Sequence, residues 1–166
     1  PGNLDYLTCG VGKVNTRRRT KILSQCSMES LSKWVEQIRE TGEVKILKGP
    51  KMGLVMMRAK DTVALEVFNL GEVLVSDCTA SVDGQLGYGV VLGNEPERAE
   101  AMAILDALFH SKGAKWEELL FNINSWLEEQ EQLQQKELQK EFNLIKRTRV
   151  NFEVMESTMG DEVDGE

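Results

Sequence analysis

The sequence is poor in the residues that build metal centres and disulfide frameworks. It contains one histidine and three cysteines, Cys9, Cys26 and Cys78, which are scattered and form no CxxC pair. A histidine-rich metal site is therefore excluded, and no cysteine cluster replaces it. A disulfide framework needs paired cysteines at regular spacing, so this pattern indicates a reducing compartment. We expect no metal site in this chain.

Long apolar runs and excess positive charge are also missing. No stretch approaches the about 18 apolar residues that a membrane-spanning helix needs, and no signal peptide is recognisable. The net charge of −7 argues against nucleic acid or an anionic membrane surface as the main partner, because both require a positive protein surface. We therefore expect a cytoplasmic protein, and its 166 residues fit one domain.

Two helices are predicted near the beginning of the sequence. Residues 1–15 show little apolar periodicity and are expected to form a flexible tail. Residues 16–26 predict a short helix that turns Ile22, Leu23 and Cys26 inward. Ser27 is placed to cap a second helix, whose apolar residues follow Leu31 at i+3, i+4 and i+7. Gly42 stands where a left-handed C-terminal cap is expected.

A sheet is predicted over residues 43–93. Five short runs rich in β-branched residues are separated by turn-forming pairs and triplets, and this close spacing leaves no room for crossover helices. The sheet should therefore be mostly antiparallel. Plausible turns are Gly49-Pro50, Lys60-Asp61 and the triplet 69–71, and Asp83-Gly84 gives the strongest hairpin signal.

The last predicted hairpin has one face of nearly bare backbone. Gly87 and Gly89 alternate with larger apolar residues, so a helix, a partner or a ligand can approach this face closely. Cys78 falls in the run before the hairpin, on the same face as Leu74 and Val82. It is a possible nucleophile, but its apolar company favours a buried structural thiol.

Helical patterns return after the sheet. Asn94 can cap a helix that has Pro96 in its first turn and Glu97 placed for a capping box. A further helix begins near Ala114 and runs into the polar stretch 128–140, so residues 114–144 predict a helical arm, and we favour an arm that lies against another chain. Residues 146–155 read as β-like, and residues 157–166 as an acidic disordered tail.

These patterns together predict one α+β domain over residues 16–156. Its mostly antiparallel sheet is flanked by N-terminal and C-terminal helices, with a long polar helical arm and a C-terminal β-like segment.

The sequence carries few signs of chemistry of its own. The stretch 10–13, GVGK, lacks the spacer and the following Ser/Thr of a phosphate-binding loop. Asp106 and His110 lie one helical turn apart and resemble a base with its orienting group, but a helix-surface pair is the simpler interpretation. Glu100 and Asp106 are six residues apart and do not share a helix face, which argues against a carboxylate dyad.

Two basic islands interrupt the acidic chain. They are residues 17–19 and the group Lys146, Arg147 and Arg149. Such islands are usually solvated, but these can also dock an acidic partner or a phosphorylated ligand.

The middle of the chain resembles a known family. The residues that carry the likeness are Gly53-Leu54-Val55, the run 68–72 (FNLGE), the run 83–88 (DGQLGY), Ala99-Glu100 and the run 104–108 (ILDAL). Their order and spacing resemble the G subunit of the bacterial carbon–phosphorus lyase system, the PhnG family. The ending Arg149-Val150-Asn151-Phe152 is similar as well, and the likeness covers roughly residues 17–155.

The resemblance implies a subunit role in phosphonate catabolism. In that family the G, H, I and L subunits together displace adenine from ATP with an alkylphosphonate, which yields ribose 1-alkylphosphonate 5-triphosphate. A later radical step by the J subunit breaks the carbon–phosphorus bond. MgATP is then a substrate of the complex, this chain binds no cofactor of its own, and its partners are chiefly the I subunit, with H, J and L.

No catalytic residue can be carried over from the family, and assembly is expected to be this chain's role, with no activity alone. Possible ligand or partner contacts are Glu72, Cys78, Gly87, Gly89, Arg98 and Glu100. Some relatives have histidine where this chain has Arg98. The alternatives are a stand-alone small-ligand-binding protein that uses the glycine face and Cys78, and a homodimeric scaffold paired through the helical arm.

Overall fold

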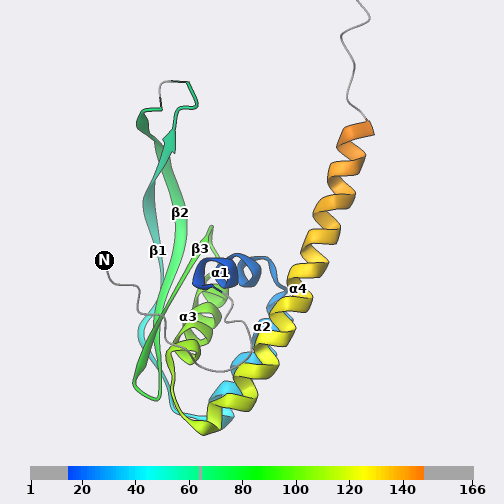
Figure 1. Cartoon of the computed structure of the whole chain (residues 1–166). Coiled ribbons are helices and arrows are strands. Elements are labelled where there is room, and N and C mark those ends of the chain that lie inside the picture. The colour runs from blue at the N-terminus through cyan, green and yellow to red at the C-terminus, as the bar shows by residue number, and fades with distance from the viewer. Residues whose placement is uncertain (1–14, 64, 148–166) are drawn as a thin grey trace, which may run out of the picture. The chain divides into compact units, whose positions relative to one another are not determined.

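The computed structural model describes residues 15–63 and 65–147, which form an α+β fold (Figure 1). The elements follow in the order α1 (Thr16–Gln25), α2 (Met28–Thr41), β1 (Val44–Lys60), β2 (Val67–Val82), β3 (Gln85–Leu92), α3 (Pro96–His110) and α4 (Ala114–Arg147). The chain divides into two compact units, residues 1–131 and 132–166, so α4 contributes to both. The predicted fold class is confirmed.

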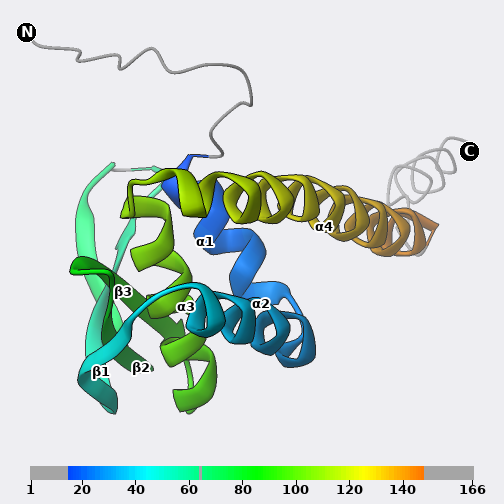
Figure 2. The same cartoon turned by 90° about the horizontal axis from the view of Figure 1, so that it is seen from below.

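The first unit is built around an antiparallel sheet with strand order β1-β2-β3. Helix α3 lies across one face of this sheet, and α1 and α2 pack on the other side of α3 (Figure 2). The first part of α4 joins this layer, since Trp126 of α4 packs at a tilt against Trp34 of α2, with the ring centroids 5.7 Å apart. The buried core therefore has α3 at its centre, with eight of its residues buried.

Two local predictions hold in detail. The Ser27 hydroxyl accepts a hydrogen bond from the backbone N–H of Ser30 and caps α2. Asp83 and Gly84 have φ angles of 48° and 80°, the left-handed values that a two-residue hairpin between β2 and β3 requires. In both places the short-range signal in the sequence predicts the observed backbone.

The predicted turns at Gly49-Pro50 and at residues 69–71 are wrong. Strand β1 runs through Gly49-Pro50, and the pairing register with β2 skips Leu47, Gly49 and Pro50. Leu70 is skipped in the same way on β2. Both sites are bulges, which put residues of turn type inside a long strand. The five predicted runs are consequently three strands, and the β1–β2 connection falls at residues 61–66.

Gly42 ends α2 in an extended conformation (φ −152°, ψ 175°), so the predicted left-handed cap is wrong. A Cβ atom at this position would lie 2.4 Å from the ring of Trp116, so the glycine makes room for that side chain. The Trp116 indole donates to Asp83 at 3.0 Å, and Asp83 also accepts from Lys115 at 2.5 Å and from the Glu43 N–H. The lysine hydrogen bond and then these other donors hold the Asp83 pKa below its ordinary value.

The N-cap of α3 is Glu95, which makes no side-chain capping bond, and Asn94 does not cap the helix as predicted. Pro96 does occupy the first turn. Ser76 of β2 closes this corner, because its buried hydroxyl donates to the Gly93 carbonyl and accepts from the Glu95 N–H, both at 2.9 Å. Bonds from the sheet therefore anchor the backbone just before α3, and the expected side-chain cap is not formed.

Helix α4 continues to Arg147, so the predicted arm is helical, and residues 146–147 are helical where a β-like segment was expected. The rest of that segment, the acidic tail and the GVGK stretch lie outside the described residues. Residues 1–14 lie outside them as well, whereas Asn15 caps α1 by accepting from the Arg17 N–H at 3.0 Å. Across the described ranges, no helix combines the length and the hydropathy that crossing a membrane requires.

Candidate functional site

The glycine face of β3 is filled by helix α3. A Cβ atom on Gly87 would lie 2.1 Å from the backbone nitrogen of Ala107, and one on Gly89 would lie 2.0 Å from the carbonyl oxygen of Ala99. Of the three occupants that the sequence allows, the structure places the chain's own helix here. Neither glycine is exposed to a ligand or to a partner in this structure.

Cys78 lies on the same covered face and is 2% exposed. Its thiol donates to the Lys48 carbonyl at 3.2 Å, and burial first, then the nearby carboxylates Glu100 and Asp77, raise the pKa of the thiol. A buried, protonated thiol is a poor nucleophile, so the side chain fills space beneath α3. The structural interpretation of Cys78 fits this geometry.

The two expected contacts on α3 take part in ion pairs. Arg98 donates to the Cys26 carbonyl at 2.6 Å and to the Glu95 carboxylate at 3.1 Å, and so ties the start of α3 to the end of α1. Glu100 accepts from Arg39 of α2 at 2.9 Å. The Arg39–Glu100 pair lines a groove of about 280 Å³ between α2 and α3, whose remaining lining mixes apolar residues with Ser32, Glu36 and Glu97.

Sequence reasoning missed a polar cluster that joins α1, α3 and β3. Arg19, with a side chain 9% exposed, pairs with Asp106 at 2.9 Å and stacks its guanidinium 3.9 Å above the Phe109 ring. The other oxygen of Asp106 accepts from the Tyr88 backbone N–H at 3.1 Å. Burial lowers the pKa of Arg19, and the bond to Asp106 partly opposes that shift.

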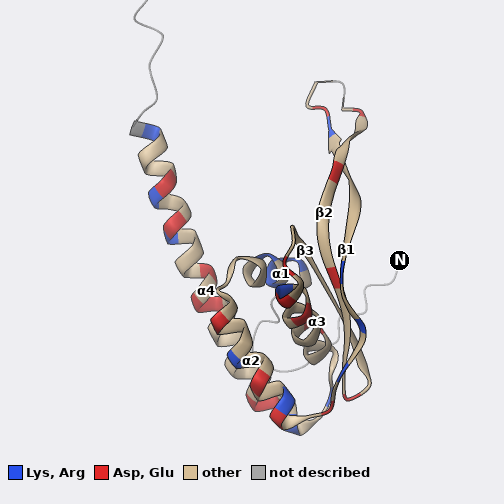
Figure 3. Ribbon diagram, turned by 180° about the vertical axis from the view of Figure 1, so that it is seen from behind, with Lys and Arg blue, Asp and Glu red and all other residues tan. Residues whose placement is uncertain are grey.

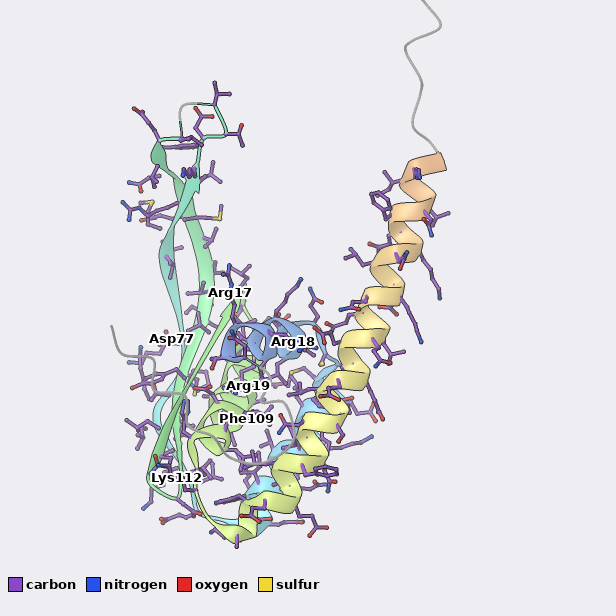
Figure 4. All side chains as sticks on the ribbon, in the orientation of Figure 1. Arg17, Arg18, Arg19, Asp77, Phe109 and Lys112 are labelled. Atoms are coloured by element: carbon purple, nitrogen blue, oxygen red, sulfur yellow. The ribbon has the colours of Figure 1, made fainter. Side chains whose placement is uncertain are left out.

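The three successive arginines of α1 point in three directions (Figure 4). Arg19 faces Phe109, Arg18 pairs with Glu131 of α4, and Arg17 lies near the end of β3. The predicted Asp106–His110 pair is a minor contact, because the His110 ring nitrogen bonds the Asp106 carbonyl and stays 3.8 Å from its carboxylate. The run of three arginines was the available signal, but the sequence did not say which one is buried.

An exposed apolar ribbon extends beyond the three-stranded part of the sheet. We define it as residues 52–63 and 65–74. Met52 and Gly53 lie opposite Ser76 and Val75, where β3 ends, and the rest lies beyond β3, which pairs only with Val75–Val82. Figure 3 shows this ribbon with few charged residues. Eleven large apolar side chains on it are at least 41% exposed: Met52, Leu54, Val55, Met56, Met57, Val63, Leu65, Val67, Phe68, Leu70 and Leu74.

Both faces of the ribbon are apolar. Side chains alternate between the two faces of a strand, and the consecutive residues Leu54, Val55, Met56 and Met57 are all exposed. Glu72, the remaining expected contact, lies on this ribbon opposite Met56 and is exposed. Consecutive apolar residues are typical of strands that are covered on both faces.

The second unit, over its described residues 132–147, is a single helical segment. Leu138, Phe142 and Ile145 follow each other at i, i+4 and i+7 and are 63–67% exposed. They line one shallow surface together with Gln135 and Gln139. An amphipathic helix of this kind presents the stripe that docks into an apolar groove of another protein.

Comparison with known proteins places these features in a family context. The profile of the family described as "Phosphonate metabolism protein PhnG" matches residues 15–157. A protein of Rhizobium meliloti (strain 1021), named alpha-D-ribose 1-methylphosphonate 5-triphosphate synthase subunit PhnG, is 38% identical over 101 residues. This alignment covers 60% of the chain and 65% of the relative, so the match spans less than two thirds of the relative's length.

Proposed function

The chain belongs to the PhnG family of phosphonate metabolism proteins, and on that premise we propose that it is one subunit of a multi-subunit transferase of phosphonate catabolism. The reaction proposed for the whole complex is the displacement of adenine from ATP by an alkylphosphonate, which forms ribose 1-alkylphosphonate 5-triphosphate. Within that complex the chain acts in assembly, and it has no activity alone.

The apolar ribbon is the single observation that carries the assembly role. A two-stranded hairpin is marginally stable in water unless a hydrophobic face packs against something else. Here both faces of the ribbon are apolar, and none of the elements within residues 15–63 and 65–131 covers either face. Exposed apolar surface of this extent is typical of a protein–protein interface.

The positions of the expected contact residues support assembly over catalysis. Cys78, Gly87 and Gly89 are buried under α3, and Arg98 and Glu100 hold helices together. Glu72 is the member of the set that lies on the ribbon, where it would meet a partner. The proposal therefore assigns no catalytic residue and no cofactor to this chain, with MgATP a substrate of the assembled complex.

The partners proposed are the other subunits of the carbon–phosphorus lyase system, chiefly I and also H, J and L, in the cytoplasm. A second candidate, a homodimeric scaffold, is favoured by one observation, the exposed stripe of Leu138, Phe142 and Ile145. In that case the isolated chain would sediment as a tight symmetric dimer.

Co-purification tests the proposal. The tagged chain is expressed together with the H, I, J and L subunits, and the proteins that stay bound are identified. We expect Phe68→Asp to lose the partners, because a charge is placed inside a desolvated interface. Phe121→Asp on α4 is the matched control, since the two rings are 46% and 55% exposed, and it should retain them.

Two results would contradict the proposal. One is a Phe68→Asp chain that retains its partners as well as the wild type does. The other is adenine release from MgATP and methylphosphonate by the purified chain alone, which would make it a complete enzyme.

A further inference from the structure

A cationic groove runs along the open edge of β3. It has a volume of about 610 Å³ and is lined by α1, by Val90–Leu92 of β3 and by the first turn of α3. Arg17, Lys21 and Arg98 bring three positive charges to its walls, and Glu95 brings the one negative charge. In a chain of net charge −7, this local excess of positive charge marks the groove as a place for an anionic group.

The floor of the groove is an unpaired strand edge. Strand β3 is the last strand of the sheet. Along it, the N–H and C=O groups of one residue face β2 and those of the next face outward. Gly93 donates to Leu74 of β2, so the even-numbered residues of β3 face outward, as Tyr88 does when it donates to Asp106. The outward N–H and C=O groups of Val90 and Leu92 then open into the groove.

The outward main-chain groups are hydrogen-bonded at one end of this edge and not at the other. At Tyr88 the outward N–H is bonded by Asp106, which Arg19 holds in place. At Val90 and Leu92, no residue in the described part of the chain outside the sheet is bonded to the main chain. Unpaired edge groups of this kind are a template for another strand.

The chemistry of the edge selects a peptide over a small anion. A phosphate group would be attracted by Arg17, Lys21 and the N–H groups, but the neighbouring carbonyl oxygens would repel it. An extended peptide matches both, because its own N–H and C=O groups alternate in the same way. Its acidic side chains would then meet Arg17 and Lys21, because Arg98 is already paired with Glu95.

We propose that the edge of β3 at Val90–Leu92 binds an extended acidic segment of a partner subunit, which adds a strand to the sheet beside α1. This inference rests on the proposed function, because the segment belongs to another member of the complex. It assigns the groove a role separate from that of the apolar ribbon. The ribbon supplies buried apolar area, and the groove supplies main-chain pairing and charge.

Hydrogen exchange of the purified complex and of the lone full-length chain tests the proposal. The Val90 and Leu92 amides should exchange at least about tenfold more slowly in the complex, because pairing with an added strand protects them. Val90→Pro removes one donor at a strand edge, where proline is tolerated, and should remove the protection of Leu92 as well. A thermal melt of the variant checks that it folds.

Charge reversal gives a second measurement that does not depend on the proline variant. Arg17→Glu/Lys21→Glu should weaken partner binding about tenfold or more, and by a larger factor at low salt than at high salt. Lys33→Glu/Lys112→Glu changes the net charge by the same amount at exposed positions outside the groove and should leave binding unchanged.

The outcomes separate this inference from the proposed function. If no partner co-purifies with the wild-type chain, the proposed function fails and the inference fails with it. If partners co-purify but the β3 amides exchange as fast as in the lone chain, the inference alone is overturned. It is also overturned if the lone chain already protects these amides and loses that protection when shortened after Arg147, because its own end would then fill the groove.

Discussion

Asp106→Asn should be the most destabilising conservative substitution among the polar residues of the described structure. The Asp106 carboxylate is the acceptor for the buried Arg19 guanidinium and for the Tyr88 N–H. An asparagine can accept only one of these bonds, and its amide group would point a donor at the other donor. Arg19 would keep its charge in a site where its side chain is 9% exposed.

The expected cost is about 3 kcal/mol of unfolding free energy, the lower end of the range for breaking a buried ion pair by removing one partner. We take the lower end because the Asp106 side chain is 19% exposed and water can reach part of the site. A loss of this size corresponds to a fall in Tm of roughly 6–12 °C for a domain of this length.

Urea denaturation of the purified chain measures the cost, with Glu100→Gln as the control. That substitution breaks the Arg39–Glu100 pair, whose side chains are 52% and 31% exposed, and it should cost less than about 1 kcal/mol. In a double-mutant cycle, Arg19→Met should recover about 1–2 kcal/mol of the Asp106→Asn cost. If Asp106→Asn costs no more than Glu100→Gln, the guanidinium is not held by this carboxylate and the reasoning is refuted.

Three further predictions follow from packing and protonation. Gly87→Ala should cost about 2–3 kcal/mol of unfolding free energy by overpacking, since its methyl group would meet the backbone of α3. The control Gly53→Ala on the ribbon meets nothing within 4 Å and should cost far less, and the urea midpoints of the two variants measure the difference. The Asp83 pKa is lowered chiefly by Lys115, so the stabilisation of the fold by this group is present above the ordinary pKa of 3.8 and is lost as pH falls through the folded-state pKa. Asp83→Asn should therefore flatten the acid side of the plot of unfolding free energy against pH, and equal slopes for the two proteins would contradict this. Burial raises the pKa of Cys26 to about 11, so iodoacetamide at pH 8 should modify it only after unfolding, as peptide mapping would show.

The helices and the second hairpin could be predicted because their signals are local. Ser27 caps its helix through an atom three residues away, and Asp83-Gly84 meets a φ requirement within the turn itself. The apolar stripe of α2 needs only the period of a helix. Each of these features depends on atoms that are near in sequence, so their effect can be read without the fold.

The failed predictions share the opposite property. Gly49-Pro50 has the composition of a turn, and only its pairing with β2 makes it a bulge. Gly42 has the sequence position of a left-handed cap, but a glycine is needed there because the ring of Trp116, 74 residues further along the chain, occupies the space of a side chain. Ser76 of the sheet anchors the backbone before α3, which no pattern around Asn94 indicates.

The residues of the candidate site also fall into those that the sequence pattern indicated and those that only the packed structure shows. The glycine face was found from alternation, but the helix that fills it could not be chosen over a ligand without the structure. The Arg19–Asp106 pair was hidden, because three adjacent arginines are equivalent in sequence and differ only in the directions they take on a helix. Burial of one of them is a property of the packed state.

The close packing of α3 on β3 also explains why the ribbon remains uncovered. Glycines on the strand and alanines on the helix bring the two backbones into contact, and this fixes α3 against the part of the sheet that contains β3. A helix of 15 residues is about 22 Å long, whereas 17 residues of β1 extend about 56 Å, so α3 cannot cover the full strand. The same contact that makes the core tight therefore leaves the far part of β1 and β2 without a covering layer. Because side chains on both faces there are apolar, one flat partner surface would protect only half of them, and the ribbon requires a partner that encloses it or two that meet across it.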